Sequence, residues 1–158
     1  MTVLGLDVGD RRVGVAVSDP TELLARPLSV LVRRSNALDA LAIGQVATEL
    51  GIRAIVVGLP LTFDSTLGPQ GKKTRAYIKF LRKSLAIPIE TWDERYSTVD
   101  AQRLMIEQNV ARARRRDLID AAAAAVILGE WLSSQRSARQ VSGMTSSNDP
   151  VLTTPAAR

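Results

Sequence analysis

The chain contains no cysteine and no histidine among its 158 residues. Without cysteine, disulfide bonds and thiolate metal sites are excluded. Without histidine, the chain has no Ser-His or Cys-His catalytic pair, no imidazole zinc site and no histidine general base. Any hydrolytic chemistry therefore has to come from carboxylates, lysines, arginines or a bound metal ion.

Long hydrophobic runs are also missing, since no apolar stretch approaches the roughly 20 residues of a membrane span. The chain opens with a strand pattern rather than a signal peptide or an arginine-rich presequence, so we expect a cytoplasmic protein with no membrane association. Acidic residues are the minority: 21 Lys and Arg against 16 Asp and Glu give a formal charge of +5. A basic surface suits a polyanionic partner, although an ordinary soluble basic protein has the same charge balance.

The hydrophobic pattern predicts one domain followed by a tail. With 158 residues, 46% of them hydrophobic, the chain is long enough for a single core. Residue patterns predict strands over 3–8, 13–17, 27–32, 53–58 and 87–92, and helices over 38–50, from after 71 to about 85, 97–108 and 118–134. The domain is expected to span residues 1–135. Residues 136–158 lack any period and are expected to form a flexible, disordered tail.

The predicted element order, three strands and then alternating helices and strands, is typical of a mixed sheet. It is the order of the ribonuclease H-like fold, an α/β fold with a five-stranded mixed sheet and helices on both faces. In that fold the end of the first strand lies beside the end of the fourth. We therefore expect the functional site at the edge of the central strands, as for other ligand sites of open α/β sheets.

An acidic residue closes the first predicted strand. Asp7 follows an apolar run, and Gly9 begins the turn after it. A carboxylate at the end of a buried strand is costly without a partner, and a bound divalent cation would supply one. The alternative is a turn aspartate that accepts hydrogen bonds from its own backbone. The local sequence favours neither interpretation.

A pair of acidic residues follows the last predicted strand. Because neighbouring side chains of a strand point to opposite faces, only one of Asp93 and Glu94 is expected to reach a given metal ion. The other would hold Arg95 or a loop amide. A solvated charged segment is the alternative interpretation.

A third acidic position, Asp120, lies one turn into the predicted last helix, for which Asp117 is the expected cap. Asp120 borders the apolar face of that helix and so is expected to look toward the strand ends. The positions expected to face the sheet are Ile119, Ala122, Ala123, Val126, Ile127 and Trp131. The alternative for Asp120 is a first-turn acid that the helix dipole favours.

Together, the three acidic positions predict a metal centre with Asp7, Asp93 or Glu94, and Asp120 as its ligands. Like charges gathered at low dielectric repel each other and have to be neutralised. Two Mg²⁺ or Mn²⁺ ions about 3.5–4 Å apart would do so, activate a water and stabilise the leaving oxygen of an in-line displacement. This pattern indicates metal-dependent phosphodiester cleavage without histidine.

Basic residues in predicted loops and helix starts form a candidate nucleic-acid-binding set. Its members are Arg11, Arg12, Lys72, Lys73, Arg95, Arg114 and Arg115. For any one of them a solvated surface charge is the simpler interpretation, whereas the whole set would neutralise several phosphates. Arg12, in the turn beside Asp7, is also a candidate to contact the scissile phosphate or to brace that turn.

Five short motifs resemble the YqgF/RuvX family, whose members are proposed as pre-16S rRNA nucleases and also as Holliday junction resolvases. The motifs span Gly5 to Asp19, Ile55 to Pro60, Gly68 to Gln70, Asp93 to Thr98 and Asp120 to Leu128. The resemblance covers residues 3 to about 132, and residues past about 135 have no counterpart. It implies a ribonuclease H-like fold and metal-dependent nuclease activity in ribosomal RNA maturation. It places three catalytic acids at Asp7, at the Asp93-Glu94 pair, where Glu94 is favoured, and at Asp120.

Three functions stay open at this stage. The first is a metal-dependent nuclease that processes the 5′ end of structured precursor 16S rRNA in ribosome biogenesis. The second is a Holliday junction resolvase or DNA nuclease in recombination and repair, acting on branched or single-stranded DNA. The third is a non-catalytic nucleic-acid-binding module, against which the full set of acids argues.

The sequence carries few signals that separate these functions. A resolvase makes paired cuts as a symmetric dimer, and no long apolar stripe is reserved for one, so we expect a monomer or a weak homodimer. No readable motif distinguishes RNA from DNA, because contacts to the 2′-OH follow no fixed pattern. Endonucleolytic and exonucleolytic cleavage are likewise not distinguished.

Overall fold

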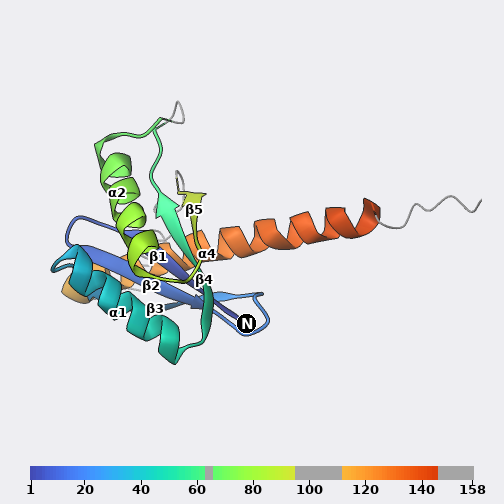
Figure 1. The fold of residues 1–158 in the computed structure, drawn as a ribbon, viewed down its shortest axis with the longest axis horizontal. Coiled ribbons are helices and arrows are strands. Elements are labelled where there is room, and N and C mark those ends of the chain that lie inside the picture. Colours follow the sequence, from blue (N-terminus) through green and yellow to red (C-terminus); the bar gives the residue numbers. More distant parts are fainter. Residues whose placement is uncertain (63–65, 95–111, 146–158) are drawn as a thin grey trace, which may run out of the picture.

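The computed structural model describes residues 1–62, 66–94 and 112–145 (Figure 1). The elements in chain order are β1 (Thr2–Val8), β2 (Arg12–Ser18), β3 (Ala25–Val32), α1 (Asn36–Glu49), β4 (Ile52–Leu59), α2 (Pro69–Ser84), β5 (Ile89–Asp93) and α4 (Arg112–Thr145). The helix predicted over 97–108 and the candidate binding residue Arg95 lie outside the described residues. Within the described ranges, none of the helices has both the length and the apolar character that a membrane-spanning segment requires.

The five strands form one mixed sheet in the order β3-β2-β1-β4-β5. Strands β1, β2 and β3 are an antiparallel meander, while β4 and β5 run parallel to β1. Because β1, β4 and β5 run in one direction, their carboxyl ends meet at the same edge of the sheet. This edge is where open α/β sheets place their ligand sites.

Helices cover both faces of the sheet (Figure 1). Alternate side chains of β1 divide between the two layers, as strand geometry requires. Leu4 and Leu6 belong to the core under α1 and α2, whereas Val3 packs with α4 on the other face. The α/β fold predicted from the sequence, a five-stranded mixed sheet with helices on both faces, is confirmed.

Helix α4 lies unusually close to the sheet because glycines face it. A Cβ atom on Gly14 of β2 would lie 1.9 Å from the backbone oxygen of Asp120. On β1, a Cβ atom on Gly5 would lie 2.8 Å from the Cβ of Leu128. These approaches, shorter than real Cβ contacts, fix the position of Asp120 against β2.

The face that α4 turns to the sheet differs from the predicted one. Its residues that pack on the sheet are Ala124, Ile127, Leu128, Trp131 and Leu132. The prediction holds for Ile127 and Trp131, but Ile119, Ala122, Ala123 and Val126 form a separate cluster with Leu118. The five consecutive alanines all have the same side chain. The apolar pattern therefore could not indicate which side of α4 packs against Gly5 and Gly14.

The start of α4 also lies earlier than the sequence predicted. The helix already includes Arg112, so Asp117 lies inside it and is not its cap. Asp120 consequently lies beyond the first turn, which contains no acidic residue. The alternative interpretation of Asp120 as a first-turn acid favoured by the helix dipole is therefore wrong.

At its other end, α4 continues to Thr145, through the first ten residues of the segment expected to be a flexible tail. Figure 1 shows this part of the helix extending away from the sheet. Arg136 donates hydrogen bonds to the carbonyl oxygens of Glu22 and Leu23, at 3.4 and 3.1 Å, and Arg139 lies 3.8 Å from the Glu22 carboxylate. These polar contacts continue the helix past its last apolar turn. Hydrophobic periodicity does not register such contacts.

Candidate active site

Asp7 lies next to the carboxyl end of β1, on the face covered by α4. Its side chain is partly buried, and it extends the same row as Val3 and Gly5, which contact α4. Burial raises the pKa of Asp7 to about 6, a hydrogen bond from Glu94 lowers it, and the negative charge of Asp120 raises it. Asp7 is therefore not a turn residue that only bonds its own backbone, because two other acids act on it.

Glu94 directly follows β5 and reaches across β4 to Asp7. Its backbone N–H lies 3.4 Å from the carbonyl oxygen of Leu59 and extends the ladder between β4 and β5 by one residue. Its side chain lies over Gly58, where a Cβ atom would be 2.5 Å from Oε2 of Glu94. Burial raises the pKa of Glu94 to about 8, with further contributions from the charge of Asp7, the hydrogen bond to Asp7 and the charge of Asp93.

The carboxyl groups of Asp7 and Glu94 share a hydrogen bond. Burial raises the pKa of both groups, and the hydrogen bond between them raises the pKa of Glu94 while it lowers that of Asp7. Two buried carboxylates that meet in this way cannot both ionise without strong repulsion. Each added unit of pKa shift costs about 1.4 kcal/mol to ionise at a given pH.

Strand alternation separates Asp93 from this pair. In β5, Trp92 packs with α4 and Ile89 packs in the core under α1 and α2. Asp93 therefore lies on the face opposite Glu94. The structure brings Glu94 to Asp7, and the charge of the neighbouring Asp93 raises the pKa of Glu94.

The indole of Trp92 helps to fix the end of β5 against α4. Its Nε1 donates to Oε2 of Glu130 at 2.9 Å, and in the opposite direction Nε1 of Trp131 donates to Oε2 of Glu90 at 3.0 Å. These two reciprocal hydrogen bonds join β5 to α4. They hold the strand end that carries Glu94 against the helix that carries Asp120.

Asp120 reaches the site from α4 but is paired with an arginine. Its Oδ2 accepts a hydrogen bond from Nε of Arg12 at 3.1 Å, and its side chain is 29% exposed. Burial raises the pKa of Asp120, the Arg12 charge and hydrogen bond lower it, and the charge of Asp117 raises it. Arg12 also lies 3.8 Å from Asp117. Arg12 thus neutralises the third acid of the predicted cluster.

A hollow of about 260 Å³ adjoins these groups. It is lined by the turn between β1 and β2, from Gly9 to Arg12, together with Asp120. Its walls carry two arginines and two aspartates, a set of groups suited to a charged ligand.

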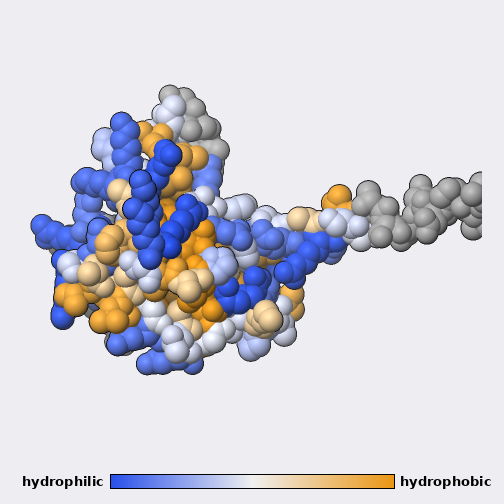
Figure 2. Space-filling model, viewed as in Figure 1, coloured by the Kyte–Doolittle hydropathy of each residue, from blue (hydrophilic) through white to orange (hydrophobic). Residues whose placement is uncertain are grey.

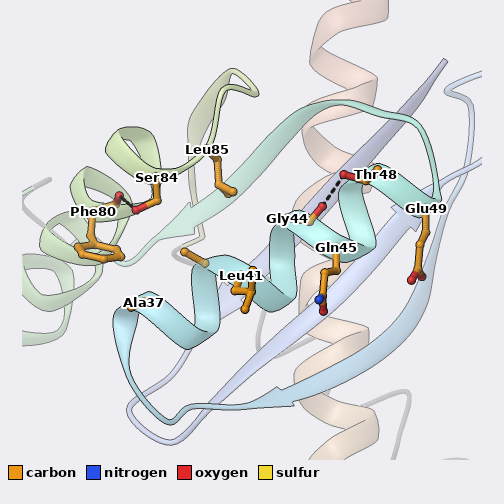
Figure 3. A pocket seen from close by; sticks show the side chains of 10 residues that line it. Ala37, Leu41, Gly44, Gln45, Thr48, Glu49, Phe80, Ser84 and Leu85 are labelled. Atoms are coloured by element: carbon orange, nitrogen blue, oxygen red, sulfur yellow. Dashed lines mark hydrogen bonds between the residues drawn. The ribbon is translucent and has the colours of Figure 1, made fainter.

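A larger hollow of about 680 Å³ lies between α1 and α2 (Figure 3). Leu41, Phe80 and Leu85 line it, and Glu49 is the one titratable side chain among the described residues of its lining. The larger hollow thus lacks the charged groups that phosphodiester chemistry needs. The charged edge beside Asp7 is the candidate site.

The candidate nucleic-acid-binding residues are distributed unevenly around this edge. Arg11 and Lys72 are exposed, and Nζ of Lys73 lies 3.5 Å from Oδ1 of Asp10 in an exposed pair. Figure 2 shows hydrophilic side chains gathered over α2. Arg114 and Arg115 lie in the first turns of α4, and their side chains are outside the described part of the chain.

Two residues that the sequence did not single out hold the turn after Asp7. Nη1 of Arg33 donates to the carbonyl oxygen of Gly9 at 3.0 Å, and Nε2 of Gln70 lies 3.4 Å from the carbonyl oxygen of Val8. Gln70 falls in one of the motifs, but its residue type did not reveal this contact. Arg33 carried no signal, because it follows a strand as any surface arginine would.

The site fits a divalent cation only in part as it stands. Among the residues that the structure describes, no three acidic side chains form a group that could hold a metal ion. Asp7 and Glu94 nevertheless offer the hard oxygen ligands that Mg²⁺ and Mn²⁺ prefer. A cation between them would replace the shared proton as the group that relieves their repulsion.

Comparison with known proteins gives a family and a fold. A family model described as "RuvX: Holliday junction resolvase" matches residues 1–134. A Thermoanaerobacter pseudethanolicus protein named "Putative pre-16S rRNA nuclease" is 44% identical over 137 residues, which are 86% of this chain and 99% of that protein. A Myxococcus xanthus protein of the same name is 43% identical over 136 residues, 86% of this chain and 90% of that protein.

Two resolvases with solved structures share the fold. T. thermophilus RuvC in complex with a Holliday junction substrate superposes with a TM-score of 0.56 at 17% identity, covering 86% of this chain and 96% of that one. The Fowlpox virus resolvase, also solved with Holliday junction DNA, gives a TM-score of 0.52 at 12% identity, with 85% and 99% covered. At these identities the likeness concerns the fold, and it agrees with the ribonuclease H-like arrangement predicted from the strand order.

Proposed function

The chain belongs to the RuvX family, and we propose that it is a metal-dependent nuclease that processes the 5′ end of precursor 16S rRNA in ribosome biogenesis. The names of relatives at 43–44% identity support the substrate. The single observation that supports the chemistry is the Asp7–Glu94 pair, two partly buried acids joined by one hydrogen bond at the sheet edge. Buried acids whose pKa values are shifted by each other are typical of functional sites.

We propose Asp7, Glu94 and Asp120 as the catalytic acids and the ligands of one or two Mg²⁺ or Mn²⁺ ions. When bound, such ions lower the pKa of a bound water and neutralise charge on the leaving oxygen. Asp7 and Glu94 would hold the cation once Glu94 loses its proton. Asp120 would join them when its Arg12 contact opens, and Asp93 would act only through its charge.

The arginines and lysines around the edge would bind the substrate backbone. Arg12 lies beside Asp120 and so is placed to move from that carboxylate to a phosphate oxygen. Arg11 and Lys72 are exposed next to the same edge, and Lys73 is paired with the exposed Asp10. Contacts of this kind give affinity for nucleic acid without sequence preference.

Cleavage of a four-way DNA junction is the second candidate function. The description of the family and the two resolvases of like fold favour it. Resolution of a junction needs two coordinated active sites, whereas we propose a monomer or a weak homodimer. For the proposed rRNA substrate, which is transcribed in the cytoplasm of bacteria, the place of action would be the cytoplasm.

One cleavage assay separates these functions. The full chain would be incubated with a precursor 16S rRNA 5′ segment, a single-stranded DNA and a four-way DNA junction, each with Mn²⁺ and with chelator. We expect Mn²⁺-dependent cleavage of the rRNA segment and none by Asp7→Asn. Preferential cleavage of the junction would establish the second function instead, and binding of all three substrates without cleavage would establish a non-catalytic module.

A further inference from the structure

An arginine from the opposite face of the sheet holds the turn that follows Asp7. The backbone N–H of Arg33 donates a hydrogen bond of 2.8 Å to the carbonyl oxygen of Arg11. Nη1 of the Arg33 guanidinium donates one of 3.0 Å to the carbonyl oxygen of Gly9. One residue therefore binds two carbonyl oxygens of a four-residue turn. The carbonyl of Gly9 receives a charge-assisted hydrogen bond, which is about twice as strong as a neutral one.

The guanidinium of Arg33 is itself held on two other sides. It lies over the ring of Tyr77, with Cζ 4.4 Å from the ring centre, and its Nε is 3.5 Å from Oδ2 of Asp39. Only 23% of the Arg33 side chain and 2% of the Asp39 side chain are exposed. The planar guanidinium makes these contacts at once, which the single ammonium of a lysine does not reproduce.

The buried Asp39 is a fully paired anchor for this arginine. Its carboxylate also accepts hydrogen bonds from the hydroxyl of Tyr77 at 3.2 Å and from the backbone N–H of Arg34 at 3.1 Å. A buried carboxylate without such partners would be strongly unfavourable. These bonds join α1, which carries Asp39, to α2, which carries Tyr77.

Helix α2 presents one row of side chains to the same turn. Gln70, Lys73 and Tyr77 follow one another at intervals of three and four residues, so they lie on one side of the helix. Gln70 reaches the carbonyl of Val8, Lys73 reaches Asp10, and Tyr77 acts through Arg33. The chain is thus held from α2 at Val8, at Asp10 and, through Arg33, at Gly9.

The braced turn carries the charged groups of the candidate site. It begins two residues after Asp7 and ends at Arg12, the partner of Asp120. The turn is closed by a hydrogen bond of 2.8 Å from the N–H of Gly9 to the carbonyl of Arg12. A shift of the Gly9 carbonyl therefore moves the backbone from which Arg12 reaches α4.

We propose that Arg33, anchored by Asp39 and Tyr77, is a positioning residue that fixes the turn from Gly9 to Arg12 and thereby sets the placement of Arg12 and Asp7 at the active site. The proposal rests on the proposed nuclease function for its effect on cleavage. Its effect on the turn itself is independent of that function. The two effects are therefore measured separately.

The test uses the full chain with three variants. Arg33→Lys keeps the charge but not the fork of donors, Tyr77→Phe removes only the hydroxyl that binds Asp39, and Arg34→Gln is the matched control at an exposed neighbouring arginine. Amide hydrogen exchange of the segment 8–13 is measured by mass spectrometry without metal. Cleavage of the precursor rRNA segment is followed under single-turnover conditions, and binding of the same RNA is measured with chelator.

For Arg33→Lys we expect exchange of segment 8–13 to accelerate about tenfold or more, the size that loss of one charge-assisted hydrogen bond implies. The cleavage rate is expected to fall about 10- to 100-fold, as misplacement of reacting groups by an ångström does. RNA affinity should change less than threefold, and exchange in β1 and β4 should stay unchanged. Tyr77→Phe should shift exchange and cleavage in the same direction by a smaller factor, and Arg34→Gln should shift neither.

Unchanged exchange of segment 8–13 in both Arg33→Lys and Tyr77→Phe would overturn the proposal. Faster exchange with a wild-type cleavage rate would also overturn it, because the turn would then not govern the active site. If Arg33→Lys fails to fold, Tyr77→Phe alone decides between these outcomes. If the wild-type chain cleaves no substrate, the proposed function fails, while the exchange data still show whether Arg33 holds the turn.

Discussion

The side chains of Glu94 and Asp7 share a hydrogen bond although their strands are not neighbours. Strand β4 lies between β1 and β5, and the side chain of Glu94 crosses it where Gly58 has no side chain. The contact between the two acids therefore depends on β4, because Gly58 leaves room for the Glu94 side chain. Acids from separate strands also explain why the pair is invisible in any local stretch of sequence.

Gly58→Ala should disrupt this crossing. The added methyl group would lie 2.5 Å from both Oε2 of Glu94 and Cδ1 of Ile127, so the glutamate has to move. We expect a destabilisation of about 1–3 kcal/mol, as overpacked cores show, and a larger relative loss of cleavage. Urea unfolding and single-turnover cleavage measure the two effects, with Gly143→Ala as control because nothing lies within 4 Å of the added Cβ there. Normal cleavage by Gly58→Ala would mean that Glu94 need not occupy the observed position.

Stability without divalent cations should fall as the pH rises from about 5 to about 8.5. The pKa values of Asp7 and Glu94 are raised by burial to about 6 and about 8, from ordinary values of 3.8 and 4.5. In this window the folded chain binds more protons than the unfolded chain, so increasing pH favours unfolding. Each kcal/mol lost should lower Tm by about 2–4 °C for a chain of this size.

Asp7→Asn should reduce that pH dependence and abolish cleavage, while leaving the fold intact or slightly more stable at pH 8. The substitution removes one titrating group and the charge that raises the pKa of the other. Thermal unfolding in chelator from pH 5 to 8.5 measures the effect, and Asp10→Asn at an exposed site is the control. A pH slope equal to that of the wild type would contradict the shared proton, and near-normal turnover at saturating Mn²⁺ would contradict the role of Asp7.

Glu94→Gln should cost far more activity than Asp93→Asn. Strand alternation places Glu94 on the face of Asp7 and Asp93 on the other face. We expect at least a tenfold difference in single-turnover rate, because loss of the groups that hold or support a metal ion typically costs 10- to 100-fold. The opposite ranking would transfer the role to Asp93, and equal minor effects would remove this segment from the site.

Affinity for nucleic acid should depend steeply on salt through the exposed basic residues. The binding constant falls with a log–log slope of roughly −0.7 to −0.9 for each phosphate contacted. Replacing Arg11 and Lys72 together by Gln should flatten that slope by about one or two units and weaken RNA and DNA binding alike. Lys83→Gln at the opposite end of α2 is the control. If the double variant keeps the wild-type slope, Arg11 and Lys72 do not contact phosphates of the bound nucleic acid.

The double variant Arg114→Gln, Arg115→Gln tests the other part of the predicted binding set. It removes two charges from the first turns of α4, the helix that carries Asp120. We expect a similar flattening of the salt slope with little change in the single-turnover rate at saturating protein. A large loss of rate at saturation would assign these arginines to the chemical step instead.

The sequence was sufficient to predict the fold and to place Asp7 and the Asp93-Glu94 pair at the ends of strands. Clearly delimited apolar strands, three of them in succession at the start of the chain, are compatible with few topologies. An acidic residue at the end of an apolar strand is also easy to recognise in the sequence. Because side chains alternate along β5, the sequence also required one of Asp93 and Glu94 to point away from Asp7. Only the packing of Trp92 and Ile89 shows that this residue is Asp93.

Other features depend on contacts between distant residues and could not be read from local patterns. The sheet-facing side of α4 follows from Gly5 and Gly14, which lie more than a hundred residues earlier in the chain. The extension of α4 beyond residue 135 follows from polar contacts to the loop after β2. The role of Arg33 follows from a turn to which it is joined only in the folded state.

Among the contacts that hold helix α4, two that lie far apart along it determine its axial register. Near one end the backbone of Asp120 rests on Gly14, and 16 residues later Arg136 is bonded to the loop carbonyls at Glu22 and Leu23. Inserting or deleting a single residue between them would turn one anchor relative to the other by about 100° and shift it by about 1.5 Å along the axis. Only one of the two anchors could then stay engaged. The number of residues between Asp120 and Arg136 therefore determines where Asp120 lies relative to Asp7 and Glu94 when both contacts are made.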